Sequence, residues 1–177
     1  MPAQKQRVAR LVVDGTGATN VATGLPILDH LLVVMAEHAG FDLALEVAPG
    51  DADEEIGAAG RALGEALHDS LAAEASRGYG SSALPADEAL AHVALEASGR
   101  PLVVSNVDLS DARVAGLHTD LAARFLRELA EGAGLTLHVR LIEGQDTQHV
   151  LDAIFKTLGV ALAQACSPRR RRGERDG

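Results

Sequence analysis

An internal repeat is the feature of this sequence that most constrains its fold. Apolar residues with helical spacing recur 94 positions later in the chain, so that Ile27, Leu31 and Met35 correspond to Leu121, Phe125 and Leu129. Residues 41–47 and 135–141 both alternate like a half-buried strand, and a second helical stretch follows each, at about residues 54–75 and 146–166. The sequence therefore predicts two copies of one structural unit.

Two strand candidates precede the helices of each half. Residues 7–13 and 17–23 flank an Asp-Gly-Thr-Gly turn signal, and residues 88–97 and 101–109 flank Ser-Gly-Arg-Pro. Each half is thus predicted as a β-β-α-β-α unit, which makes the fold class α+β with two small sheets that carry two helices each. Because the helix-bearing face of a small sheet needs a cover, the units are expected to pack together as one pseudo-twofold domain.

Glycine, proline and arginine mark the expected boundaries. Gly78, Gly80 and Pro85 predict a linker over residues 76–87. The first unit is therefore placed at residues 1–82 and the second at residues 83–168. The arginine-rich residues 169–177 are predicted to form a disordered tail.

Charge and composition exclude several classes of function. The formal net charge of -9 argues against general nucleic-acid binding by the folded body. No stretch approaches the ~20 apolar residues of a membrane span, and the N-terminus has no apolar signal segment. Cys166 is the only cysteine, so no internal disulfide is possible. These features predict a cytoplasmic protein without a membrane partner.

Residues 136–156 hold the side chains with the most distinctive chemistry. Helical spacing puts His149, Asp152 and Lys156 on one face of a helix. Imidazole and carboxylate groups are ligands for divalent transition metals, and His138 on the preceding strand offers a further imidazole. The same residues also suit a solvated helix face, so spacing alone leaves both interpretations open.

Short motifs in the chain follow the order found in a known family. They are residues 14–17, 23–30, 38–43, 85–90, 98–101, 136–138 and 149–156. Over roughly residues 8–168 the chain resembles imidazoleglycerol-phosphate dehydratase, a lyase of histidine biosynthesis. The resemblance implies halves like ribosomal protein S5 domain 2. It also implies trimers that join into a large cubic assembly through manganese sites at subunit contacts.

The resemblance implies a set of metal ligands. In the family two metals hold the imidazole ring of the substrate, and loss of water converts imidazoleglycerol phosphate to imidazoleacetol phosphate. The matching ligand positions here are His30, His138, His149 and Asp152. Asp152 replaces the Glu of a His-His-x-x-Glu motif, and Gln148 replaces its first His.

The corresponding His-His-x-x-Glu motif of the first half is absent. The internal offset puts Glu54 and Glu55 at its histidine positions, whereas counting back from Gly60 puts Asp53 and Glu54 there. These acids are candidate replacement ligands for manganese, or helix N-terminal acids favoured by the helix dipole. A full two-metal centre is therefore not expected, and the chain is predicted to stop at trimers.

The resemblance also implies residues that contact the substrate. His38, Glu88 and Lys156 match catalytic or substrate-pocket positions, and Arg100 matches a phosphate-binding arginine. Gly78 replaces a second such arginine, with Arg77 beside it, and the family's lysine-bearing C-terminal motif is missing. The plainer alternatives are a helix-boundary histidine for His38 and a turn residue for Arg100.

Three functions remain open at this level. The chain could be a divergent metal-dependent dehydratase that acts on a small phosphorylated imidazole. It could be an inactive relative that serves as an oligomeric structural or interaction subunit. The same scaffold could also have a changed ligand or reaction.

Overall fold

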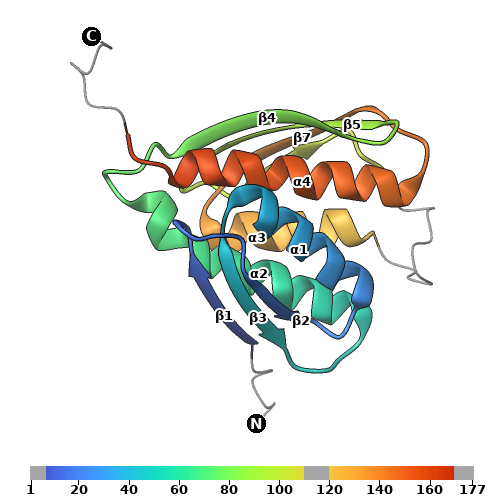
Figure 1. The fold of residues 1–177 in the computed structure, drawn as a ribbon, viewed down its shortest axis with the longest axis horizontal. Helices are drawn as coiled ribbons and strands as arrows, with labels where there is room; N and C mark the ends of the chain where they lie inside the picture. Colours follow the sequence, from blue (N-terminus) through green and yellow to red (C-terminus); the bar gives the residue numbers. More distant parts are fainter. Residues whose placement is uncertain (1–6, 110–119, 170–177) are drawn as a thin grey trace.

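The computed structural model describes residues 7–109 and 120–169. This part forms four helices that lie between two sheets (Figure 1). The first half contributes β1 (Arg7–Val12), β2 (Thr19–Ala22), α1 (Pro26–Ala39), β3 (Asp42–Val47) and α2 (Ala52–Ala72). The second half contributes β4 (Tyr79–Ala86), β5 (Ala89–Glu96), β6 (Leu102–Ser105), α3 (Leu121–Ala133), β7 (Thr136–Glu143) and α4 (Thr147–Cys166).

The strand topology repeats between the halves. Sheet 1 has the order β1-β3-β2 and sheet 2 has the order β4-β5-β7-β6, so β5, β7 and β6 repeat the pairing of β1, β3 and β2. In each triplet the central strand is antiparallel to the first strand and parallel to the last. The predicted α+β fold of duplicated β-β-α-β-α units is confirmed, with β4 as an additional edge strand.

The two halves differ most between their second strand and first helix. β3 and β7 start 94 residues apart, at Asp42 and Thr136, whereas β2 and β6 start 83 residues apart, at Thr19 and Leu102. The segment between β6 and α3 has 15 residues and the segment between β2 and α1 has 3, so the second half is 12 residues longer there.

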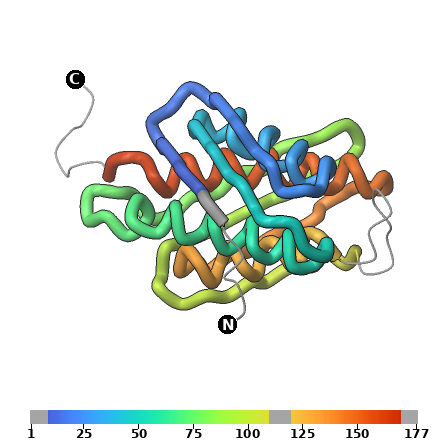
Figure 2. The backbone as a smooth tube through the Cα atoms, turned by 90° about the horizontal axis from the view of Figure 1, so that it is seen from below, coloured from blue at the N-terminus to red at the C-terminus, as the bar shows by residue number. Residues whose placement is uncertain are grey.

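The hydrophobic core lies where the helices meet each other and the sheets. α1 packs on α4 and α2 packs on α3, while α2 covers sheet 1 and α4 covers sheet 2. Phe41, Phe125 and Phe155 are fully buried, and the rings of the last two have centroids 5.1 Å apart. Seen from below, the strands of sheet 1 cross obliquely over the helix layer (Figure 2). The two halves thus share one core, as the need to cover each small sheet predicted.

Glycines allow α2 and α3 to approach closely. A Cβ at Gly60 would lie 2.6 Å from the carbonyl oxygen of Phe125, and one at Gly64 would lie 2.6 Å from that of Leu129. Because both contacts advance in the same direction along the chain, α2 and α3 run parallel. The contacts between α1 and α4 advance in the same way. All four helices begin at one end of the molecule, on the right in Figure 1.

Acidic side chains cap three of these helix starts. Asp51, Asp120 and Asp146 each accept a hydrogen bond from the backbone N–H three residues further on. Each cap satisfies a free N–H group and complements the positive end of the helix dipole. α1 instead begins with Pro26, whose fixed φ suits a first helical position. The helix-start end of the molecule is therefore rich in acids.

The predicted linker over residues 76–87 is wrong, because β4 occupies most of it. β4 is at the edge of sheet 2, where Pro85 needs no N–H for a second neighbouring strand. Gly80 lies where β4 passes the Ala161 carbonyl of α4 too closely for a Cβ. The expected boundary between residues 82 and 83 thus falls inside a strand.

The residues after α4 are anchored at their start. The Arg169 N–H donates to the Ala75 carbonyl at 2.6 Å, next to a β-bridge between Ser76 and Pro168. This contact ties the end of α4 to the end of α2. The remainder of the predicted tail, residues 170–177, lies outside the described residues.

Among the described helices, α4 is long and apolar enough by length and composition to cross a membrane. Its position in the fold accounts for this composition, because 61% of its most apolar window is buried inside the molecule. A core helix between a sheet and another helix has the same character.

Candidate active site where the two halves meet

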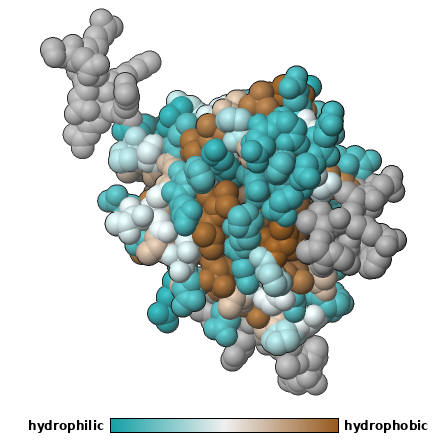
Figure 3. Space-filling view, turned by 45° about the vertical axis from the view of Figure 1, so that its right-hand side comes forward, coloured by the Kyte–Doolittle hydropathy of each residue, from teal (hydrophilic) through white to brown (hydrophobic). Residues whose placement is uncertain are grey.

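The starts of α1 and α4 bring together predicted ligands from both halves. His30 Nε2 lies 2.9 Å from Asp152 Oδ1, and Gln148 Nε2 donates to the same oxygen at 3.2 Å. The His30 side chain is 52% exposed, so it is accessible from outside the chain. Hydrophilic side chains cover much of this end of the molecule, with apolar bands between them (Figure 3). Parallel packing of α1 and α4 therefore creates a polar site between the halves.

Carboxylates surround the imidazole of His149. Its Nδ1 lies 2.6 Å from Glu88 Oε2 and 3.9 Å from Asp146 Oδ1, and its Nε2 lies 3.4 Å from Asp87 Oδ2. The hydrogen bond to Glu88 raises the pKa of His149, the three negative charges add to this effect, and desolvation opposes it. Both ring nitrogens thus face acids of the same chain.

The backbone at the start of α4 holds Glu88 in place. Its Oε1 accepts hydrogen bonds from the N–H groups of Asp146 at 2.9 Å and Gln145 at 3.4 Å. The Asp146 bond, followed by the bond to His149, lowers the pKa of Glu88 to about 2. Asp87, at the tip of the β4–β5 hairpin, has a φ of +50°. The hairpin therefore presents an ionised carboxylate to α4.

Of the other predicted catalytic residues, one joins this site and one does not. Lys156, one turn beyond Asp152, donates to the Pro85 carbonyl at 3.0 Å. His38 lies at the far end of α1, with its Nδ1 2.8 Å from the Val34 carbonyl. His30 and His38 are eight residues apart, which is about 12 Å along a helix. The two histidines therefore share no pocket.

His138 projects from the outer face of sheet 2. Its neighbours Leu137 and Val139 are buried on the face that α4 covers, and strand alternation directs His138 to the other side. Leu102, Val104 and Ile142 are exposed large apolar residues on the same outer face. Within one chain, the fold does not bring His138 to His149 or Asp152.

The donor atoms of this site contact one another within one chain. Across residues 7–109 and 120–169 there is no group of three or more His, Cys, Asp or Glu side chains placed to hold a metal ion. His30 and Asp152 contact each other, and the ring nitrogens of His149 face acids.

The first-half acids that were candidate ligands lie at the start of α2, and each has different neighbours. Glu55 is only 7% exposed and accepts a hydrogen bond from the Gly50 N–H at 2.9 Å. The exposed Glu54 follows the cap and donates its own N–H to Asp51. Asp53, at the other possible ligand position, pairs with Arg124 of α3, with 3.4 Å between Oδ2 and Nε.

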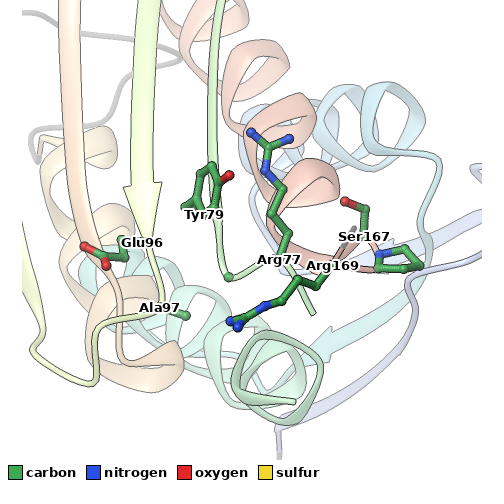
Figure 4. A pocket seen from close by; sticks show the side chains of 8 residues that line it. Arg77, Tyr79, Glu96, Ala97, Ser167 and Arg169 are labelled. Atoms are coloured by element: carbon green, nitrogen blue, oxygen red, sulfur yellow. The ribbon is translucent and has the colours of Figure 1, made fainter. Parts of the chain in front are cut away.

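A cavity of about 820 Å³ lies at the opposite end of the molecule, where α4 ends and β4 begins (Figure 4). Arg77 and Arg169 both line it, and the Arg77 guanidinium carbon is 4.3 Å from the centroid of the Tyr79 ring. Arg77 Nε is buried and has no hydrogen-bond partner among the described residues. Guanidinium groups suit an anion such as phosphate. The two here extend in different directions, and the carboxylate of Glu96 also lines the cavity (Figure 4).

Arg77 and Arg100 were the arginines predicted for phosphate, and Arg169 was not among them although it lines the cavity. The run of arginines is typical of a solvated tail, and only the bridge between Ser76 and Pro168 places Arg169 at the cavity. Arg100 follows Ala97, which lines the cavity, on the exposed β5–β6 turn. Its backbone N–H donates to Ser98 Oγ at 3.0 Å, so the predicted turn geometry is present.

The histidine site and the arginine cavity are far apart within one chain. Asp152 and Ser167, which caps the end of α4, are fifteen residues apart, or about 22 Å along the helix axis. This exceeds the length of an imidazole ring, a three-carbon chain and one phosphate. A small phosphorylated ligand therefore cannot contact both places in the same chain.

Fold and site together define a duplicated α+β protein with a polar site between the starts of helices from its two halves. A model of the imidazoleglycerol-phosphate dehydratase family matches residues 23–162. The chain belongs to this family, whose members are lyases of histidine biosynthesis.

Individual relatives match most of the chain. The imidazoleglycerol-phosphate dehydratase of Desulforudis audaxviator is 41% identical over 169 residues, which cover 93% of this chain and 86% of the relative. That of Acetivibrio thermocellus is 40% identical over 158 residues, covering 86% and 80%. The Staphylococcus aureus enzyme structure matches with a TM-score of 0.83 at 31% identity, covering 95% of this chain and 96% of that chain.

Proposed function

We propose that this chain is an imidazoleglycerol-phosphate dehydratase-like protein of histidine biosynthesis, located in the cytoplasm, with reduced metal and phosphate sites. One observation supports this most directly. His30 and Asp152 meet at 2.9 Å between α1 and α4, where the family resemblance puts metal ligands. The equivalent junction lies between α2 and α3, where Asp53 is paired with Arg124 instead of a histidine.

This arrangement predicts slow dehydration. A carbon-bound proton beside an imidazole is a poor acid, and metal ions stabilise the negative charge that develops when it leaves. Loss of part of that stabilisation is worth several kcal/mol, so we expect a rate at least about 100-fold below that of a relative with both His-His-x-x-Glu motifs. His149 and Lys156 remain on α4 as side chains that can donate a proton.

We also propose that a second copy of this chain completes the ligand site, with trimers as the unit of assembly. The separation of the histidine site from the arginine cavity supports this, because one ligand needs both an imidazole-binding end and a phosphate-binding end. His138 and the exposed apolar residues Leu102, Val104 and Ile142 lie on an outer face that another copy can reach.

Metal analysis and a dehydratase assay on the purified chain test the proposal. We expect fewer than two manganese ions per subunit and turnover of imidazoleglycerol phosphate at least about 100-fold below that of a complete relative assayed in parallel. Two tightly bound manganese ions together with a comparable rate would contradict the proposal. Size measurement in the presence and absence of manganese tests whether assembly stops at trimers.

A non-catalytic subunit is the second candidate. The uncovered outer face of sheet 2, with Leu102, Val104 and Ile142, favours an interaction role. Co-expression with a complete dehydratase tests it, because this chain would then purify in mixed assemblies. Separate elution of the two proteins at micromolar concentration would count against this candidate.

A further inference from the structure

Arg124 occupies the position in the second half that corresponds to His30 in the first. The two residues are 94 positions apart, which is the offset that relates α1 to α3. His30 contacts Asp152 of α4, and Arg124 contacts Asp53 of α2. The two junctions are therefore pseudo-twofold equivalents, one with an imidazole facing a carboxylate and the other with a guanidinium.

The guanidinium of Arg124 lies between acids of two helices. Its Nη1 donates to Glu128 Oε1 at 2.7 Å, one turn further along α3. Its Nε is buried, lies 3.4 Å from Asp53 Oδ2, and makes no hydrogen bond within the described ranges. The contact with Asp53 is thus one of opposite charges rather than an aligned hydrogen bond. Arg124 neutralises acids of both α2 and α3.

Gly57 of α2 makes room for this guanidinium. A Cβ at Gly57 would lie 2.7 Å from the guanidinium carbon and 2.9 Å from Nε of Arg124, and it would overlap Nη2. When Asp53 and Glu54 are placed at the histidine positions of the absent motif, the glutamate position falls on Gly57. A glycine at position 57 therefore has no side chain to bind a metal, and it leaves space for the Arg124 guanidinium.

We infer that Arg124 is the permanent cation of the junction between α2 and α3. Its guanidinium takes the space that a metal ion and a glutamate ligand would need, and it ties α2 to α3. A metal ion at this place would be repelled by the guanidinium and would compete for Asp53. Asp53 therefore does not bind manganese. This inference rests on the proposed function and identifies Arg124 as the side chain that replaces the missing part of the metal centre.

Thermal unfolding of four variants tests the role of Gly57. In the otherwise unchanged chain, Gly57→Ala lowers the Tm because the new Cβ displaces the Arg124 guanidinium from its acids. In an Arg124→Ala background the same change raises the Tm, because alanine favours a helix over glycine and the overlap is gone. Arg127→Ala is the matched control, since Arg127 is an exposed arginine of the same helix. In that background Gly57→Ala still lowers the Tm.

The sign of the Gly57→Ala shift decides this test. The same sign in the unchanged and Arg124→Ala backgrounds overturns the inference. If Arg124→Ala does not fold, Arg124→Met keeps the apolar stem and serves as the second background.

Manganese calorimetry on the folded chain gives an independent readout. We expect Asp53→Asn to leave the number of manganese ions bound per subunit unchanged, whereas Asp152→Asn lowers any binding that the unchanged chain shows. Loss of a bound ion in Asp53→Asn would overturn the inference. A fast dehydration rate would contradict the proposed function without affecting either test, so the two failures are distinguishable.

Discussion

His149 shows how neighbouring charges set the protonation state of one side chain. Hydrogen bonds from the start of α4 lower the pKa of Glu88, and Glu88 in turn raises the pKa of His149. The raised pKa of His149 contributes stability below its ordinary value of 6.5, and this is lost as pH rises through the raised pKa. The lowered pKa of Glu88 contributes above 4.5 and is lost as pH falls towards about 2. Both contributions to stability are therefore fully present between pH 4.5 and pH 6.5, the ordinary pKa values of the two groups.

Glu88→Gln tests this coupling. Removal of the charge and of the strongest hydrogen-bond acceptor should lower the pKa of His149 towards its ordinary value of 6.5. NMR titration of the His149 ring protons measures the change. Glu96→Gln, at the other end of β5, is the control and should leave the titration unaltered. A His149 pKa that stays raised in Glu88→Gln would show that the other acids are sufficient.

Gln148→His tests whether one restored histidine rescues dehydration. The side chain at position 148 now donates to Asp152, so the change adds an imidazole beside His149 and His30. We expect no rescue, since the junction between α2 and α3 still has Arg124 where the proposal puts the lost metal ligands. An increase in turnover of imidazoleglycerol phosphate by more than about tenfold, equivalent to about 1.4 kcal/mol of barrier, would contradict this expectation.

At the scale of elements, the α2–α3 contact depends on the absence of side chains. Gly60 and Gly64 face carbonyl groups of α3 at distances that no Cβ tolerates. Glycine lowers the intrinsic stability of a helix, so α2 loses propensity and gains close packing in return. The contact joins the first half to the second and is therefore part of the shared core.

Gly60→Ala should destabilise the chain although alanine is the better helix former. The added methyl would lie 2.6 Å from the Phe125 carbonyl, and overpacking of this kind costs about 1–3 kcal/mol. Urea unfolding measures the loss as a lower midpoint with an unchanged slope. Ala66→Ser, a similar increase in size on a half-exposed part of α2, should change stability by less than about 0.5 kcal/mol. Equal stability of Gly60→Ala and the parent would show that α2 and α3 can separate at low cost.

The sequence predicted the elements whose pattern is local and repeated. α1 and α3, β3 and β7, and α2 and α4 follow the 94-residue offset closely. β4 was missed because Gly78, Gly80 and Pro85 are typical of a loop, while their real roles depend on α4 and on the edge of sheet 2. Local chemistry does not reveal which distant element a glycine faces.

The site was predictable in composition but not in arrangement. Helical spacing placed His149, Asp152 and Lys156 on α4, and strand alternation was visible around His138. Which face of sheet 2 receives α4 is a matter of packing, and it puts His138 on the other side. The approach of His30 to Asp152 likewise depends on α1 and α4 running parallel across the halves.

At the scale of the whole molecule, the histidine site and the arginine cavity lie at opposite ends of α4. We expect Arg77→Ala and His149→Ala each to weaken binding of imidazoleglycerol phosphate, because each removes one end of the site that we propose is shared between copies. Dissociation and reassociation of the two variants together should restore part of the binding, since some mixed sites then have both ends intact. Calorimetry measures the recovery. Mixtures that bind no better than the separate variants would contradict a shared site.

The common direction of the four helices gathers their capping acids at one end of the molecule. Acids such as Asp51, Asp120 and Asp146 gather at the helix starts, and Arg77 and Arg169 lie at the other end. Two copies that meet start to end bring unlike charges together, whereas like ends repel. Such heterologous contacts close into a ring or continue as a filament, according to the rotation between neighbours. Ionic strength, which screens charges beyond about 8 Å in physiological salt, then becomes a control on how many copies join.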